Sequence, residues 1–91
     1  MIEREVKIVN QLGLHARAAA QLVRLASDFQ SKINLERIDN AAISANAKSI
    51  LSVLNLAAAK GTRLKLIVEG IDEEKASAAL EEVLAVGFGE F

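Results

Sequence analysis

The residues that could carry chemistry in this 91-residue chain gather around its single histidine, His15. Gly13 permits a sharp bend just before it, and the alanine-rich segment after it favours a helix. A helix start exposes unpaired backbone N–H groups and the positive end of the helix dipole, which together attract anions. Arg17 adds a delocalised cation close by. This spacing predicts that His15 carries a phosphoryl group at the start of a helix.

The expected chemistry is nucleophilic attack by a neutral imidazole on phosphorus. The positive potential at a helix start favours the neutral ring. The backbone N–H groups of Ala16 and Arg17 would then stabilise the phosphoryl oxygens. The sequence does not choose between the two ring nitrogens. Because a lone histidine at a helix start is more often an ordinary solvated or capping residue, the prediction needs support from elsewhere in the chain.

A second motif, Asn46-Ala47-Lys48-Ser49-Ile50-Leu51, lies near the middle of the chain. Asn46 is predicted to cap a helix over residues 47–56, which puts Ser49 in the first turn. Val53, Leu56 and Ala57 would face the core. A neighbouring apolar cluster is too large for a two-layer fold to hide completely; its members are Ile50, Leu51 and Leu54.

Hydrophobic periodicity predicts four strands and three helices along the chain. The strands are expected over residues 2–9, 31–38, 41–45 and 63–69. The helices are expected over residues 16–29, over 47–56, and from a cap at Asp72 to Gly87. This βαββαβα order predicts an α+β two-layer open-faced sandwich in one domain, residues 1–91, with a four-stranded antiparallel sheet covered on one face by three helices.

Composition excludes several classes of function. The net charge of −1 with interspersed signs leaves no basic footprint for nucleic acid or for a membrane surface. No paired histidines or clustered carboxylates suggest a metal site, and no glycine-rich loop suggests a nucleotide, so we expect no cofactor. The first residues lack a signal-peptide pattern, and no apolar run is long enough to cross a bilayer. A cytoplasmic protein is expected.

The segment Asn10-Gln11-Leu12-Gly13-Leu14-His15-Ala16-Arg17 closely resembles the active-site signature of the HPr family. These are the histidine-containing phosphocarriers of the phosphoenolpyruvate-dependent phosphotransferase system. The second motif resembles the family signature around a regulatory serine, and the resemblance covers essentially the whole chain. It implies a stoichiometric carrier, not a turnover enzyme, that accepts a phosphoryl group from phospho-enzyme I on Nδ1 of His15. Most members have proline where this chain has Ala18.

The resemblance also implies partners. The carrier would pass its phosphoryl group to enzyme IIA proteins, and an HPr kinase/phosphorylase would modify Ser49. The docking surface would comprise Arg24, Lys48, Ile50, Leu51 and Leu54, on a monomer. Two alternatives stay open: a nitrogen-type regulatory relay that moves no sugar, and a small α+β binding module in which His15 is incidental.

Overall fold

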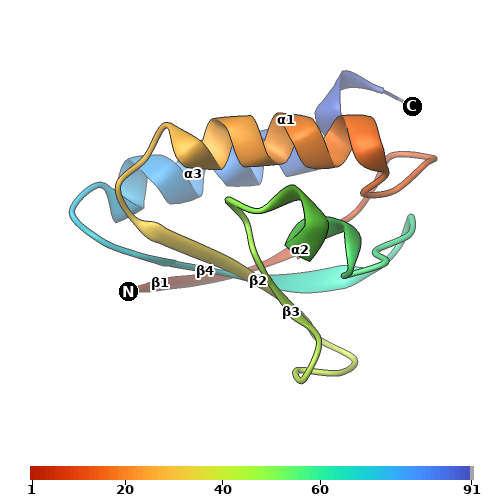
Figure 1. Ribbon diagram of the computed structural model, residues 1–91, viewed down its shortest axis with the longest axis horizontal. Helices are drawn as coiled ribbons and strands as arrows, with labels where there is room; N and C mark the ends of the chain where they lie inside the picture. The colour runs from red at the N-terminus through yellow and green to blue at the C-terminus, as the bar shows by residue number, and fades with distance from the viewer. Residues whose placement is uncertain (91) are drawn as a thin grey trace.

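The chain folds into one sheet and a layer of helices (Figure 1), in a computed structural model that describes residues 1–90. The strands are β1 (Ile2–Lys7), β2 (Lys32–Arg37), β3 (Ser44–Asn46) and β4 (Arg63–Glu69). The helices are α1 (Ala16–Ser27), α2 (Ile50–Leu54), α3 (Glu73–Ala85) and a 3-10 turn, η1 (Gly87–Gly89).

The four strands lie in the order β1-β4-β2-β3, and every neighbouring pair is antiparallel. In the register of the central pair, Leu35 of β2 lies opposite Leu66 of β4. Within residues 1–90, helices α1, α2 and α3 lie on one side of the sheet and no helix covers the other side (Figure 1). The predicted open-faced α+β sandwich is therefore confirmed.

Alternating residues of the two central strands turn toward the helices, as period-2 patterning requires. Helix α1 contributes Leu22 and Ala26 to the same core, and α3 contributes Leu80 and Leu84. Burying one such aliphatic side chain contributes about 1.5–3 kcal/mol. The strand residues in this layer are Ile33 and Leu35 from β2 and Leu64, Leu66 and Val68 from β4.

The predicted return strand over 41–45 is wrong in its position. Residues 39–43 form a turn, in which Ile43 N donates to Asn40 O at 2.9 Å and Ala42 N donates to Asn40 Oδ1 at 3.1 Å. Strand β3 begins only at Ser44 and includes Asn46. The asparagine side chain bends its own backbone into a turn, and this preference outweighs the weak strand propensity of the alanines.

The predicted start of the second helix is wrong as well. Asn46 does not cap it, because its Oδ1 accepts from Lys48 N at 2.9 Å within the loop. Ser49 is the cap instead: its Oγ accepts from Ser52 N at 3.3 Å, and α2 starts at Ile50. Helix α2 is also shorter than predicted. Ala57 lies beyond it, exposed and with φ +49°, and does not face the core.

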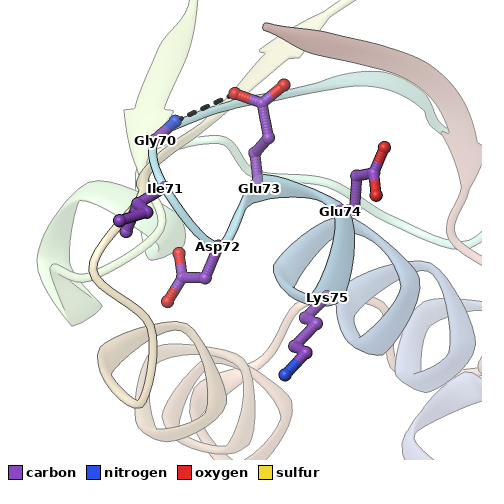
Figure 2. Close-up of a pocket in the computed structure, with 6 residues that line it drawn as sticks. All are labelled: Gly70, Ile71, Asp72, Glu73, Glu74 and Lys75. Atoms are coloured by element: carbon purple, nitrogen blue, oxygen red, sulfur yellow. Dashed lines mark hydrogen bonds between the residues drawn. The ribbon is translucent and has the colours of Figure 1, made fainter.

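Asp72 precedes α3 as predicted, but its carboxylate does not cap that helix. It accepts from the backbone N–H groups of Gln30 at 2.8 Å and Ser31 at 3.0 Å, and from the Ser31 hydroxyl. Asp72 lines a pocket at this turn (Figure 2), where Glu73 accepts from Gly70 N at 3.1 Å. Asp72 thus ties the start of α3 to the connection between α1 and β2.

Candidate functional site

His15 is the N-cap residue of α1, in extended backbone conformation with φ −77° and ψ −179°. The first intrahelical bond runs from Ala19 N to His15 O at 2.8 Å. The N–H groups of Ala16, Arg17 and Ala18 therefore have no carbonyl partner within the helix. His15 makes no side-chain cap, and the first turn holds no acidic residue. With its side chain 27% exposed, the imidazole lies beside an electropositive helix start.

Gly13 makes the bend that brings His15 to this position. Its φ is +66°, a conformation that glycine adopts at little cost, and its N–H donates to Asn10 O at 3.1 Å. Leu14 N donates to Ala58 O at 2.9 Å. A Cβ on Gly13 would lie 2.5 Å from that same Ala58 oxygen. The predicted glycine bend is confirmed, and backbone packing adds a second reason for it.

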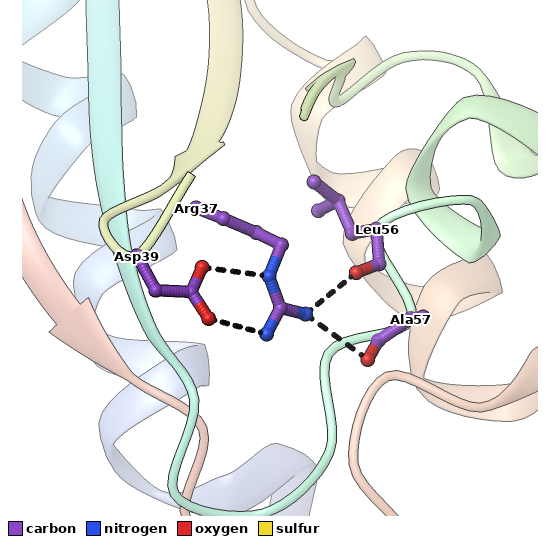
Figure 3. A network of polar contacts seen from close by, with 4 residues as sticks. All are labelled: Arg37, Asp39, Leu56 and Ala57. Carbon is purple, nitrogen blue, oxygen red and sulfur yellow. Dashed lines mark hydrogen bonds and ion pairs between the residues drawn. The ribbon is translucent and has the colours of Figure 1, made fainter. Parts of the chain in front are cut away.

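The segment behind the bend is held by Arg37, at the end of β2 (Figure 3). Its Nη1 donates to Leu56 O at 2.9 Å and to Ala57 O at 3.2 Å. Its Nε and Nη2 each donate to the Asp39 carboxylate at 2.9 Å, which lowers the pKa of Asp39. This arginine fixes the backbone next to Ala58, and so supports the bend that presents His15.

Two residues to which the sequence assigned no role complete the surroundings of His15. Glu90 Oε1 lies 2.6 Å from His15 Nε2, and the buried Asn10 Nδ2 donates to the same oxygen at 2.9 Å. Asn10 also donates to Gly13 O at 2.8 Å. The bonds from His15 and then Asn10 lower the pKa of Glu90, and the positive charge of Arg17 adds to this.

The contact with Glu90 spans 75 positions of sequence, so local patterns gave no sign of it. The sequence offered one sign that the tail packs on the core. This is Phe88, a large apolar residue between two glycines after the last helix. Phe88 is 7% exposed and belongs to the core, which brings the tail back over the start of α1.

The predicted cations have different surroundings. Arg17 and Arg24 are both exposed on α1, seven residues or about two turns apart, as the sequence predicts. Lys48 is half-buried, and its Nζ donates to Phe29 O at 2.7 Å, beyond the end of α1. Its ammonium group therefore ties the loop before α2 to the connection that follows α1.

The predicted apolar cluster lies on α2. Leu51 is 75% exposed and Ile50 is 44% exposed, so the structure leaves both on the surface as expected. Leu54 is half-buried and packs against the core. Ser49 lies directly before these residues as the cap of α2. Exposed apolar residues that gather on one helix are typical of a transient protein-binding surface.

Within residues 1–90, no three histidine or acidic side chains lie close enough together to hold a metal ion. Among the helices of that same range, none is long and apolar enough to cross a membrane.

An open α+β sandwich with a partly exposed histidine at a helix start is a small domain suited to bind an anionic group at that histidine. Residues 2–85 match the family described as "PTS HPr component phosphorylation site", and the chain belongs to this HPr family of the phosphotransferase system. It is 42% identical to the phosphocarrier protein HPr of Cupriavidus necator over 99% of this chain and 98% of that one.

Two further similarities are consistent with this family. The crystal structure of HPr-C-His from Thermoanaerobacter tengcongensis superposes with a TM-score of 0.91 at 42% identity, covering 100% of this chain and 99% of that chain. A multiphosphoryl transfer protein of Salmonella typhimurium is 34% identical over 99% of this chain, which matches 24% of that longer protein.

Proposed function

We propose that this protein accepts a phosphoryl group from phospho-enzyme I on His15 and delivers it to enzyme IIA proteins. One observation carries the proposal: a partly exposed imidazole at the start of α1, beside backbone N–H groups that have no helical partner. The protein acts as a stoichiometric carrier and is a cytoplasmic monomer. It is again unphosphorylated after one transfer from the donor and one transfer to the acceptor.

The transfer itself is an in-line displacement at phosphorus. The lone pair of one His15 ring nitrogen forms the new N–P bond, while the bond from phosphorus to the donor's leaving atom breaks and its electron pair departs with that atom. The N–H groups of Ala16 and Arg17 donate to the phosphoryl oxygens, and the Arg17 guanidinium offsets their charge. Ala18 replaces the proline of most members and adds one further N–H in this first turn.

Partners dock on the surface formed by the exposed face of α1 and by α2. Arg17 and Arg24 steer acidic partners, and the exposed apolar side chains give the contact its area. The surface comprises Arg24, Ile50, Leu51 and Leu54, with Lys48 at its edge. An HPr kinase/phosphorylase that phosphorylates Ser49 would add negative charge beside this surface and weaken docking.

The direct test is incubation with enzyme I and labelled phosphoenolpyruvate. We expect one acid-labile phosphoryl group per wild-type chain and none on His15→Ala, with circular dichroism showing that the variant is folded. Absence of label on the wild type would overturn the proposal and favour a binding module. The IIA protein that removes the label then separates sugar transport from a nitrogen-type relay.

A further inference from the structure

We propose that Glu90 is a positioning residue that keeps the proton of the His15 ring on Nε2 and leaves Nδ1 as the only nucleophilic nitrogen. The inference rests on the proposed function of His15 as the phosphoryl acceptor. The residues around His15 in the sequence leave open which ring nitrogen reacts. Here a side chain far from His15 in the sequence, Glu90, decides it.

The geometry of the contact sets the tautomer. A carboxylate only accepts hydrogen bonds, so the 2.6 Å contact between Glu90 Oε1 and His15 Nε2 places the hydrogen on Nε2. A neutral imidazole carries one N–H, so its other nitrogen, Nδ1, holds a free lone pair. The two ring nitrogens point away from each other, so Glu90 blocks one of them without covering the other. A carboxylate that orients a reactive imidazole through one ring nitrogen is an established catalytic device.

The tail holds Glu90 in place before any ligand arrives. Phe88 is buried in the core, and two turn bonds of 3.0 Å follow it, from Gly89 N to Val86 O and from Glu90 N to Gly87 O. The carboxylate then receives a second bond at 2.9 Å from the buried Asn10. A side chain fixed by its own backbone, by a core anchor and by a buried amide is preorganised, so binding His15 costs it little conformational entropy.

The same contact balances charge during transfer. When the Nδ1 lone pair forms the N–P bond, the ring still carries its Nε2 proton and gains a positive charge. That proton stays in the bond to Glu90, whose negative charge lies on the side of the ring away from the phosphoryl group. When an acceptor takes the phosphoryl group, the N–P electron pair returns to Nδ1 and the ring is again neutral with its proton on Nε2. No proton needs to enter or leave the site.

The test uses Glu90→Ala, with two comparison variants. Glu90→Gln keeps an oxygen acceptor in place but removes the charge. Glu82→Ala removes one negative charge from an exposed position on α3, and so controls for net charge. The ¹⁵N chemical shifts of the His15 ring nitrogens report the tautomer of the unphosphorylated protein. We expect a single Nε2–H tautomer in the wild type, Glu90→Gln and Glu82→Ala, and a mixture of tautomers in Glu90→Ala.

A second measurement reads the site of phosphorylation with phosphoramidate, a small donor that needs no enzyme and releases ammonia as the N–P bond to His15 forms. We expect phosphorylation at Nδ1 alone in the wild type, and loss of that selectivity, with an added Nε2 isomer, in Glu90→Ala. If Glu90→Ala keeps one tautomer and one isomer, Glu90 does not position the His15 ring. Since neither measurement uses enzyme I, that result is distinct from failure of the wild type to label with phosphoenolpyruvate, which would overturn the proposed function.

Discussion

At the scale of single residues, the reactivity of His15 depends on how neighbouring backbone presents it. The residues beside it, Leu14 and Ala16, bring no charge, and the electropositive environment comes from the start of α1 and from Arg17. This makes the position of the ring, set by the bend at Gly13, as important as its chemistry. A perturbation of that bend should therefore affect both the stability of the fold and the transfer rate.

Gly13→Ala tests this dependence. Alanine at φ +66° is strained, and its Cβ would lie 2.5 Å from Ala58 O, an oxygen fixed by the bond from Leu14 N. Backbone strain of this kind costs about 1–3 kcal/mol, and we expect a loss of that size in the free energy of unfolding, together with slower labelling by enzyme I. Urea unfolding and initial labelling rates would measure the two effects.

Gly61→Ala is the matched control. Gly61 also has a positive φ, +93°, but no atom lies within 4 Å of the position its Cβ would take. The variant Gly61→Ala should therefore lose less stability than Gly13→Ala and keep the wild-type labelling rate. Equal losses in the two variants would show that the contact with Ala58 has no part in presenting His15.

The sequence predicts those members of the site that are close together in the chain. Gly13, His15 and Arg17 fall within five positions, and the physical roles of a bend, a nucleophile and a cation are visible from residue type alone. Asn10 and Glu90 are different, because a buried amide and a carboxylate acquire their roles only when the tail folds over α1. Their pairing depends on the tertiary packing of Phe88, to which the sequence points only through a large apolar residue between two glycines.

At the scale of elements, α2 is the part of the molecule where prediction and structure differ most. Asn46 and Ser49 are both good caps, and the sequence alone favours the first of them. The structure uses Asn46 within β3, paired with Asn34, and this tertiary pairing delays the helix to Ile50. The shift makes Ser49 the cap itself, directly beside the exposed apolar residues, and this strengthens the case for it as a control point.

Ser49→Asp tests that role. Aspartate keeps an oxygen acceptor for Ser52 N, so the cap survives, while the new negative charge lies beside the surface proposed to meet acidic partners. We expect slower labelling of His15 by enzyme I, with the unfolding midpoint close to that of the wild type.

Ser49→Ala is the companion variant, which removes the cap and adds no charge. It should lose about 1 kcal/mol of stability and keep the wild-type labelling rate. If Ser49→Asp is folded and labels as fast as Ser49→Ala, then charge at this position does not control docking.

At the scale of the whole molecule, the helix layer has two ends with different functions. Helix α1 has 12 residues and is about 18 Å long, with His15 at its start. Beyond its other end, Asp72 ties the α1–β2 connection to α3, inside the pocket of Figure 2. Two of the carboxylates there already have internal partners, since Asp72 binds Gln30 and Ser31 and Glu73 binds Gly70. We therefore regard this end as a clamp that holds the helices over the sheet.

The clamp predicts how stability depends on pH. The Ser31 hydroxyl and then the Gln30 N–H lower the pKa of Asp72, so the folded state favours the ionised carboxylate. Its stabilising effect is complete above the ordinary aspartate pKa and is lost as pH falls through the lower value of the folded state. The stability difference between wild type and Asp72→Asn should therefore be largest near neutral pH and shrink between about pH 5 and pH 2. Urea unfolding across this range would measure it. In a Ser31→Ala background, which lacks the main donor, this change of the stability difference with pH should be smaller. If the stability difference between wild type and Asp72→Asn stays constant with pH, the ionised Asp72 carboxylate does not stabilise the fold.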